Sequence, residues 1–237
     1  MTRLPPLLRL VNPVAERALV VGDPGRALEL AQALLERPLM SNHQRGLWGY
    51  TGTASDGRSL TIQSTGTGGP SAVAVLGELA AAGVRTVVRV GSAVAVDPRI
   101  DRAAVHVVAR AEGADGTSRA LGAERSVLPD RLLLERLTAS GAPVVRMRSV
   151  DLLPQDGGPA LPALPDGDAG EAGEPLALDR QSAAILAAAR RLGVAAAAVV
   201  AFPDPDEDEA ARTAWWRAAG LLAARGLGVA APAPSAD

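Results

Sequence analysis

The sequence predicts a single α/β domain with a central β-sheet and helices on both faces. Apolar, strand-like runs alternate along the chain with helical segments, an alternation typical of a sheet that is covered on both sides, with sites at the strand ends. The chain has 237 residues, of which 48% are hydrophobic. That content is enough for one sizeable core and gives no reason to expect a second domain.

The expected elements follow from apolar runs and from Gly and Pro at their ends. The expected strands lie near 18–21, 47–53, 59–64, 85–90, 104–109, 143–147 and 194–202. The expected helices lie between them, near 26–36, 70–83, 129–139, 180–192 and 210–225. Residues 154–175 are Gly, Pro, Asp and Glu with little to bury, so we expect a mobile surface loop there. We expect the tail 230–237 to be disordered.

The most informative segment, 64–97, contains two glycine turns on either side of an apolar helix. A glycine turn lets backbone N–H groups converge on an anion, and the helix that starts at Pro70 or Ser71 adds the positive end of its dipole. Arg89 ends an apolar run, and a buried arginine needs an anionic partner. The alternative is a tight strand-to-helix turn with Arg89 in a structural ion pair, and this segment alone leaves both open.

A second element of the same kind lies upstream. The apolar run 18–21 is followed by a turn at 22–26 and then by an amphipathic helix, so two strand ends could meet at one anion. Between the two elements, the strand-like stretch 42–52 carries Arg45. Taken singly, Arg26 would be a surface residue of a first helical turn and Arg45 a solvated strand charge. Their common pattern favours ligands of an anion.

Four motifs together resemble the nucleoside phosphorylase family, in its purine and uridine phosphorylase branch. They are GDPGR at 22–26, QRGLWGYTG at 44–52, STGTGGPS at 64–71 and RVGS at 89–92, in the order and spacing of that branch. The resemblance is specific over 18–98 and weaker towards the C-terminal helix. It implies a mixed sheet and phosphate-dependent cleavage of the N-glycosidic bond of a purine or pyrimidine nucleoside. Inorganic phosphate is then the co-substrate, and no other cofactor is implied.

The resemblance also implies a phosphate site. Gly22 would offer its backbone N–H, Arg26 and Arg89 their planar guanidinium groups, and Ser92 its N–H and hydroxyl. The family arginine at the position of Arg45 reaches into a neighbouring subunit's site. A homodimer, or a hexamer built from such dimers, is therefore expected.

The sugar site departs from the family pattern. Gln181 stands where the family has its ribose-binding glutamate, and Arg180 stands where a methionine packs against the ribose. Glutamine can donate to and accept from sugar hydroxyls, but it lacks the negative charge that favours a cationic transition state. A bulky cation at 180 would crowd that transition state. These changes predict an altered sugar site and weak activity on common ribonucleosides.

Asp204 is the candidate proton donor to the leaving base, because the purine branch places an aspartate after the corresponding strand. That role needs a buried carboxyl group with a raised pKa. Asp204 also opens the acidic run 204–209, which is more often a solvated loop and a first helical turn. Arg212 could assist the acid or could be a plain helix-surface residue.

Composition narrows the remaining classes. A formal net charge of −2 argues against a nucleic-acid partner, and the absence of cysteine excludes disulfides and thiolate metal sites. His43 and His106 lack metal-ligand spacing, so no metal site is expected. The N-terminus is too proline-rich for a signal peptide, and the apolar run 194–202 is too short to cross a membrane. A cytoplasmic protein without a membrane partner is expected.

Three functions of different classes remain open. The first is a nucleoside phosphorylase with an altered sugar site. The second is a catalytically weak or inactive family member that binds phosphate or a phosphorylated ligand, or is a structural partner. The third is an N-glycoside hydrolase, which uses water in place of phosphate. Arg26, Arg45 and Arg89 argue against it, because a water nucleophile needs no arginine to bind it.

Overall fold

A computed structural model describes residues 5–123, 125–158, 173–204 and 206–229. The strands are β1 (Arg17–Val21), β2 (Glu36–Asn42), β3 (Gly49–Thr53), β4 (Ser59–Ser64), β5 (Thr86–Ser92), β6 (Val94–Ala95), β7 (His106–Gly113), β8 (Ser126–Val127), β9 (Val144–Ser149), β10 (Leu176–Asp179) and β11 (Ala195–Ala201). The helices are α1 (Pro24–Leu34), α2 (Gly69–Ala81), α3 (Gly116–Ala120), α4 (Arg131–Thr138), α5 (Ser182–Leu192) and α6 (Glu209–Gly226).

These strands form one mixed sheet in the order β2-β3-β4-β1-β5-β11-β7-β9-β10-β6, with β8 paired to β7. β4, β1, β5 and β11 are mutually parallel neighbours, whereas β2, β3 and β4 pair antiparallel and β7 runs antiparallel to β11. Because β4, β1, β5 and β11 are parallel, their carboxyl ends lie at one edge of the sheet. The predicted mixed sheet in a single α/β domain is confirmed.

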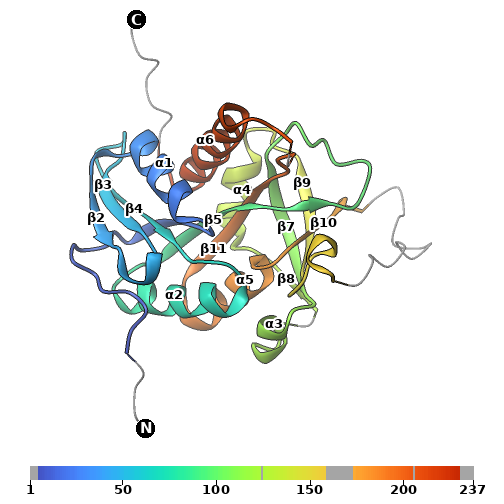
Figure 1. Ribbon diagram of the computed structural model, residues 1–237, viewed down its shortest axis with the longest axis horizontal. Coiled ribbons are helices and arrows are strands. Elements are labelled where there is room, and N and C mark those ends of the chain that lie inside the picture. Colours follow the sequence, from blue (N-terminus) through green and yellow to red (C-terminus); the bar gives the residue numbers. More distant parts are fainter. Residues whose placement is uncertain (1–4, 124, 159–172, 205, 230–237) are drawn as a thin grey trace, which may run out of the picture.

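Helices cover both faces of the sheet, as expected. In Figure 1, α1, α4 and α6 lie on one side of the strands and α2, α3 and α5 on the other, and each layer has its own apolar core. Small residues allow close packing between helices. A Cβ atom on Gly220 of α6 would lie 2.4 Å from Leu30 Cδ2 of α1, so a larger residue there would force the Leu30 side chain to move.

Every expected strand and helix is present; β4 has the expected ends, and the ends of the others are shifted by up to a few residues. Helix α1 begins at Pro24, earlier than expected, because the Asp23 carboxylate caps it by accepting the Arg26 N–H at 2.8 Å. The stretch 42–52 is not one strand, so that expectation was wrong. Residues 44–46 form a single 3-10 turn in which Arg45 has a positive φ of 57°.

The sequence did not indicate β2, β6, β8, β10 or α3. Strand β2 is mostly exposed and is held by main-chain pairing with β3, so it shows no apolar alternation. Strand β10 lies directly after the segment expected to be a loop. Of that segment, 159–172 lies outside the described residues, as does the tail 230–237, so those expectations stay predictions. Within the described part of the segment, Pro154–Asp156 form a 3-10 turn.

Candidate anion-binding site

A cavity of about 960 Å³ opens at the carboxyl ends of β1, β5 and β11. It brings together all the sequence-predicted site residues except one. The predicted residues that line it are Gly22, Arg26, Arg89, Ser92, Arg180, Gln181, Asp204 and Arg212. Arg45 does not line it. The tertiary structure thus assembles residues from both halves of the chain around one space.

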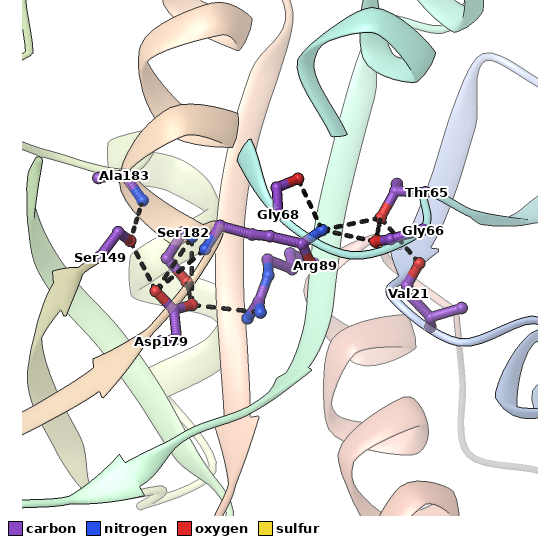
Figure 2. Close-up of polar contacts among 10 residues, drawn as sticks. Val21, Thr65, Gly66, Gly68, Arg89, Ser149, Asp179, Ser182 and Ala183 are labelled. Atoms are coloured by element: carbon purple, nitrogen blue, oxygen red, sulfur yellow. Dashed lines mark hydrogen bonds and ion pairs between the residues drawn. The ribbon is translucent and has the colours of Figure 1, made fainter. Parts of the chain in front are cut away.

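Arg89 is the most buried cation of the cavity, with a side chain that is 6% exposed. Its Nη2 atom lies 3.2 Å from Asp179 Oδ2 (Figure 2). Its Nη1 atom makes no hydrogen bond with any residue in the described ranges. Burial lowers the pKa of Arg89, and the charge of Asp179 opposes that shift. Arg89 therefore has a carboxylate partner within the chain and still has an unused donor.

Gly91 makes room for this guanidinium group. Residues two apart on a strand share one face, and an added Cβ at Gly91 would lie 1.8 Å from Arg89 Nη1 and 2.2 Å from Arg89 Cζ. The arginine side chain therefore lies against bare backbone at the end of β5. The glycine of the RVGS motif has a steric reason for being glycine.

Asp179, at the end of β10, was not predicted as a site residue. Its carboxylate is fully buried and accepts the Ser149 and Ser182 hydroxyl groups, each at 2.6 Å, and the Ser182 N–H at 3.1 Å (Figure 2). These donors hold the charge of Asp179 next to Arg89. The sequence feature that could have indicated Asp179 is its position after the apolar run 176–178 and directly before the expected helix 180–192.

Arg26 projects from the first turn of α1 and lies over the Trp216 ring, 3.3 Å from its centroid. Burial lowers the pKa of Arg26 to about 10, the charge of Asp23 opposes this shift, and the positive charge of Arg89 adds to it. Arg26 is still protonated at neutral pH, and its Nε atom has no hydrogen-bond partner among the described residues. Two arginines that repel each other would be stabilised by an anion between them.

The loop that follows β4 supplies the glycine turn. The Thr65 N–H donates to the Val21 carbonyl at 2.7 Å, which joins the ends of β4 and β1. Gly66 and Gly68 have positive φ angles of 71° and 86°, which glycine adopts without a steric penalty. Among the described residues, no side chain caps the α2 helix that follows, so its N-terminus stays available for an anion.

Gln181 holds this loop in place. Its Nε2 atom donates to the Gly66 carbonyl at 2.7 Å and to the Gly68 carbonyl at 3.1 Å. Two acceptors on one side fix which end of the amide faces the loop, and a glutamate carboxylate could not donate there. The side chain is buried, and Gln181 lines the cavity with its amide N–H groups already engaged.

Arg180 lines the cavity, and its charge is paired with a carboxylate. It forms an ion pair with Asp156 across the rim, and this hydrogen bond lowers the pKa of Asp156. Each of the two side chains is about one-third exposed. The cation that was expected to crowd the sugar is therefore held towards Asp156.

Asp204 and Arg212 line the same cavity but do not pair with each other in the described part of the chain. Asp204 is exposed, and its Oδ1 accepts the Asp206 N–H at 3.0 Å. Arg212 donates from Nη1 to the Glu207 carbonyl at 2.6 Å. This is the setting of a solvated loop carboxylate rather than of a buried acid, so the catalytic roles of Asp204 and Arg212 stay predictions.

Two further predicted site residues, Ser92 and Arg45, are exposed, and His106, for which no metal-binding role was expected, is buried. Ser92 is exposed at the end of β5 and lines the cavity. Arg45 is exposed on its 3-10 turn, and its place in a neighbouring subunit's site stays a prediction. His106 is buried edge-on against Phe202, with ring centroids 5.1 Å apart, and burial lowers the pKa of His106.

The described residues contain neither a candidate metal centre nor a candidate membrane-spanning helix. No group of three or more His, Asp or Glu side chains there is placed to hold a metal ion. Among the helices of the described ranges, none combines the length and apolar character needed to cross a membrane.

The fold and site define an α/β protein with an anion-binding cavity at the ends of parallel strands. The sequence profile of the phosphorylase superfamily matches residues 16–155, which is more than half of the chain. The chain therefore belongs to the phosphorylase superfamily, and the predicted family resemblance is confirmed.

Similar proteins include three DeoD-type purine nucleoside phosphorylases. The chain is 41% identical to that of Geobacillus kaustophilus over 88 residues, which are 37% of either chain. It is 43% identical to that of Clostridium perfringens over 81 residues, 34% of either chain. It is 36% identical to that of Oceanobacillus iheyensis over 107 residues, 45% of this chain and 44% of that one. The matches thus span less than half the length of these relatives.

Proposed function

We propose that this protein is a nucleoside phosphorylase that cleaves the N-glycosidic bond of a nucleoside with inorganic phosphate. The observation that carries the proposal is the pair Arg26 and Arg89. Both line one cavity, both have guanidinium nitrogens without a hydrogen-bond partner among the described residues, and each raises the cost of the other's charge. A bound phosphate would use those donors and neutralise that repulsion.

The arrangement supports a mechanism based on position and charge. A phosphate oxygen forms the bond to C1′ of the sugar while the C1′–N bond breaks, and the base leaves with the electron pair and takes up a proton. Arg26 and Arg89 would orient the phosphate against C1′. The buried charge of Asp179, behind Arg89, would add negative potential beside the sugar as it becomes cationic.

The altered sugar site is part of the proposal. The amide N–H groups of Gln181 are used by the glycine loop, which leaves the amide oxygen as its remaining polar atom for a ligand. We therefore expect weak turnover of common ribonucleosides. The relatives are named purine nucleoside phosphorylases, so purine nucleosides come first in a substrate panel, followed by uridine.

The second candidate function is phosphate binding without turnover. Two observations favour it: Asp204 is exposed rather than buried, and a glutamine stands at 181. Both candidates share the anion site and differ only in whether the glycosidic bond breaks.

The test measures base release from inosine, adenosine and uridine with and without phosphate, together with phosphate affinity by calorimetry. The variant is Arg26→Ala, and the matched control is Arg131→Ala, an 84% exposed arginine of α4 outside the cavity. We expect phosphate-dependent base release, and phosphate affinity reduced about ten- to hundredfold in R26A alone.

The possible outcomes separate the candidates. Phosphate binding without any base release supports the second function. Base release that does not need phosphate supports a hydrolase. Failure of phosphate to bind the wild-type protein removes both of the proposed functions.

The proposed assembly is a homodimer or a closed multiple of dimers in which Arg45 completes a neighbour's site. Sedimentation at micromolar concentration tests it, with Arg45→Ala compared with the wild type for phosphate affinity. A monomeric wild-type protein that binds phosphate as tightly as R45A would contradict this assembly.

A further inference from the structure

The cavity is larger than a phosphate ion needs, and cations line much of the rest of its wall. Its volume of about 960 Å³ is in the range of sites that hold whole small molecules. Three arginines line it in addition to Arg26 and Arg89, namely Arg102, Arg180 and Arg212. All the Trp, Tyr and Phe residues of the chain are described, and none of them lines it. The wall therefore favours charged groups over stacking on an aromatic ring.

Arg102 is an arginine of this wall whose side chain has no partner among the described residues, whereas Arg212 donates to the Glu207 carbonyl. Arg102 is exposed, lines the cavity, and makes no hydrogen bond or ion pair within the described ranges. Arg180, by contrast, is paired with Asp156. Arg99, in the same loop as Arg102, lies outside the cavity and is paired with Asp97 at 2.7 Å. Within this loop, the arginine outside the cavity, Arg99, is thus paired with a carboxylate, whereas the arginine at the cavity, Arg102, is not.

The backbone around Arg102 is held in a hydrogen-bonded turn. The Asp101 carboxylate accepts the Ala103 N–H at 2.9 Å, and the Asp101 carbonyl accepts the Ala104 N–H at 3.1 Å. The ring of His106 then packs edge-on against Phe202 at the end of β11. Arg102 therefore projects from a fixed position rather than from a long free loop.

The sheet order separates Arg102 from the phosphate-binding arginines. Arg102 leads into β7, β7 pairs with β11, and β11 pairs with β5, which carries Arg89. Two strand spacings set β5 and β7 about 10 Å apart, and Arg102 lies in the loop just before β7. A lateral offset of this order matches the scale of a pentose that carries a phosphate at each end.

We propose that Arg102 forms a second anion subsite, and that the preferred substrate class is the nucleoside 5′-monophosphates. The inference rests on the proposed phosphorolysis. Inorganic phosphate between Arg26 and Arg89 forms the bond to C1′, the C1′–N bond breaks, and the base takes the electron pair and a proton. The products are the free base and pentose 1,5-bisphosphate. The 5′-phosphate does not react, and Arg102 binds it.

This subsite fits the altered sugar end of the cavity. Binding energy from a group remote from the reaction can position the reacting atoms. A substrate held through charges at both ends depends less on contacts to the sugar hydroxyl groups. Gln181, whose amide N–H groups are engaged by the glycine loop, then contributes less to binding than a sugar-binding carboxylate would.

The test compares kcat/KM for inosine 5′-monophosphate and for inosine, with phosphate, in the wild type, Arg102→Ala and the control Arg131→Ala. We expect the wild type to prefer the monophosphate by about ten- to hundredfold, the range for one charge-assisted contact. That preference should fall towards one in R102A and stay unchanged in R131A. A preference for inosine, or an equal preference in R102A and the wild type, overturns the proposal.

A binding measurement separates this proposal from the proposed function. If neither compound is turned over, phosphorolysis fails, and calorimetry with ribose 1,5-bisphosphate and ribose 1-phosphate then decides the subsite. Bisphosphate binding at least about tenfold tighter in the wild type, lost in R102A, supports it. Equal affinities for the two sugars overturn it.

Discussion

Two buried arginines of the sheet, Arg17 and Arg89, look alike by burial and charge but differ in how many of their donors are used. Each side chain is 6% exposed and each faces a carboxylate. Arg17 begins β1 at the amino end of the parallel strands, and Arg89 lies in the middle of β5. The two side chains differ in the polar groups that surround them.

Arg17 uses all five of its N–H groups. It donates to both oxygens of Asp56, at 2.6 and 2.7 Å, and to the carbonyls of Ser59, Arg58 and Leu227. Arg89 has one ion pair and an Nη1 without a partner in the described ranges. A buried arginine with every donor satisfied belongs to the framework. One with an unused donor beside a cavity points to a ligand.

Removing Arg17 should have the largest effect on stability. Arg17→Met leaves the Asp56 carboxylate, which is 16% exposed, and three backbone carbonyls without their donor. We expect the free energy of unfolding to fall by about 3 kcal/mol or more, as when one partner of a buried ion pair is removed. Urea denaturation measures this change. A fall of less than about 1 kcal/mol would show that Arg17 is not the structural residue inferred here.

The same substitution at Arg89 should affect binding more than stability. In Arg89→Met the Asp179 carboxylate loses its cationic partner but keeps its hydrogen bonds from Ser149 and Ser182, which partly compensate its buried charge. We expect phosphate affinity to fall about a hundredfold and the free energy of unfolding to fall by less than in R17M. Calorimetry and urea denaturation of one preparation check both values. If R89M is as unstable as R17M, Arg89 is a structural residue.

A smaller effect is expected at Gly91, where the arginine itself is kept. A methyl group there would overlap Arg89 Nη1 and Cζ, so the guanidinium must move, while the backbone conformation of Gly91 is open to alanine. We expect Gly91→Ala to weaken phosphate binding about tenfold. Gly77→Ala is the control, because an added Cβ there meets no atom within 4 Å. Unchanged phosphate affinity in G91A would show that the site does not depend on the position of Arg89.

The smallest effect is a pH dependence of the framework pair. The hydrogen bonds from Arg17 lower the pKa of Asp56, so the folded state favours the ionised carboxylate. The resulting stabilisation is complete above the unfolded-state pKa of about 3.9 and is lost as the pH falls through the lower folded-state value. The stability of the wild type should therefore approach that of Asp56→Asn between about pH 4 and pH 2. A constant difference over that range would contradict the assignment.

Much of the fold was predictable, because buried strands and amphipathic helices carry their pattern locally. The β4 strand was predicted with its observed ends, and the strand over 18–21 and the glycine loop after β4 were also predicted. Arg89 was predicted at the end of its strand and lies in the middle of β5. Strand β2 was missed because its pairing is made by main-chain groups of β3. Strand β10 was missed because it is short and follows a segment without apolar pattern.

The candidate site divides in the same way. The glycine turns and their neighbouring arginines could be predicted from the sequence. Glycine lets the backbone approach an anion closely, and the guanidinium group of arginine can bind two phosphate oxygens at once. The engagement of Gln181 with the loop carbonyls could not be predicted, because its partners are more than a hundred residues away along the chain. The ion pair between Arg89 and Asp179 likewise joins residues far apart along the chain.

By itself the sequence determined the class of the fold, the order of its elements and the residue types available for an anion. These are properties of local conformation and of hydrophobic periodicity, which neighbouring residues decide. Only the tertiary structure decided which arginine is satisfied and which is left with a free donor. That difference depends on the carbonyls, carboxylates and ring faces that the fold brings to each guanidinium group, and these come from distant parts of the chain.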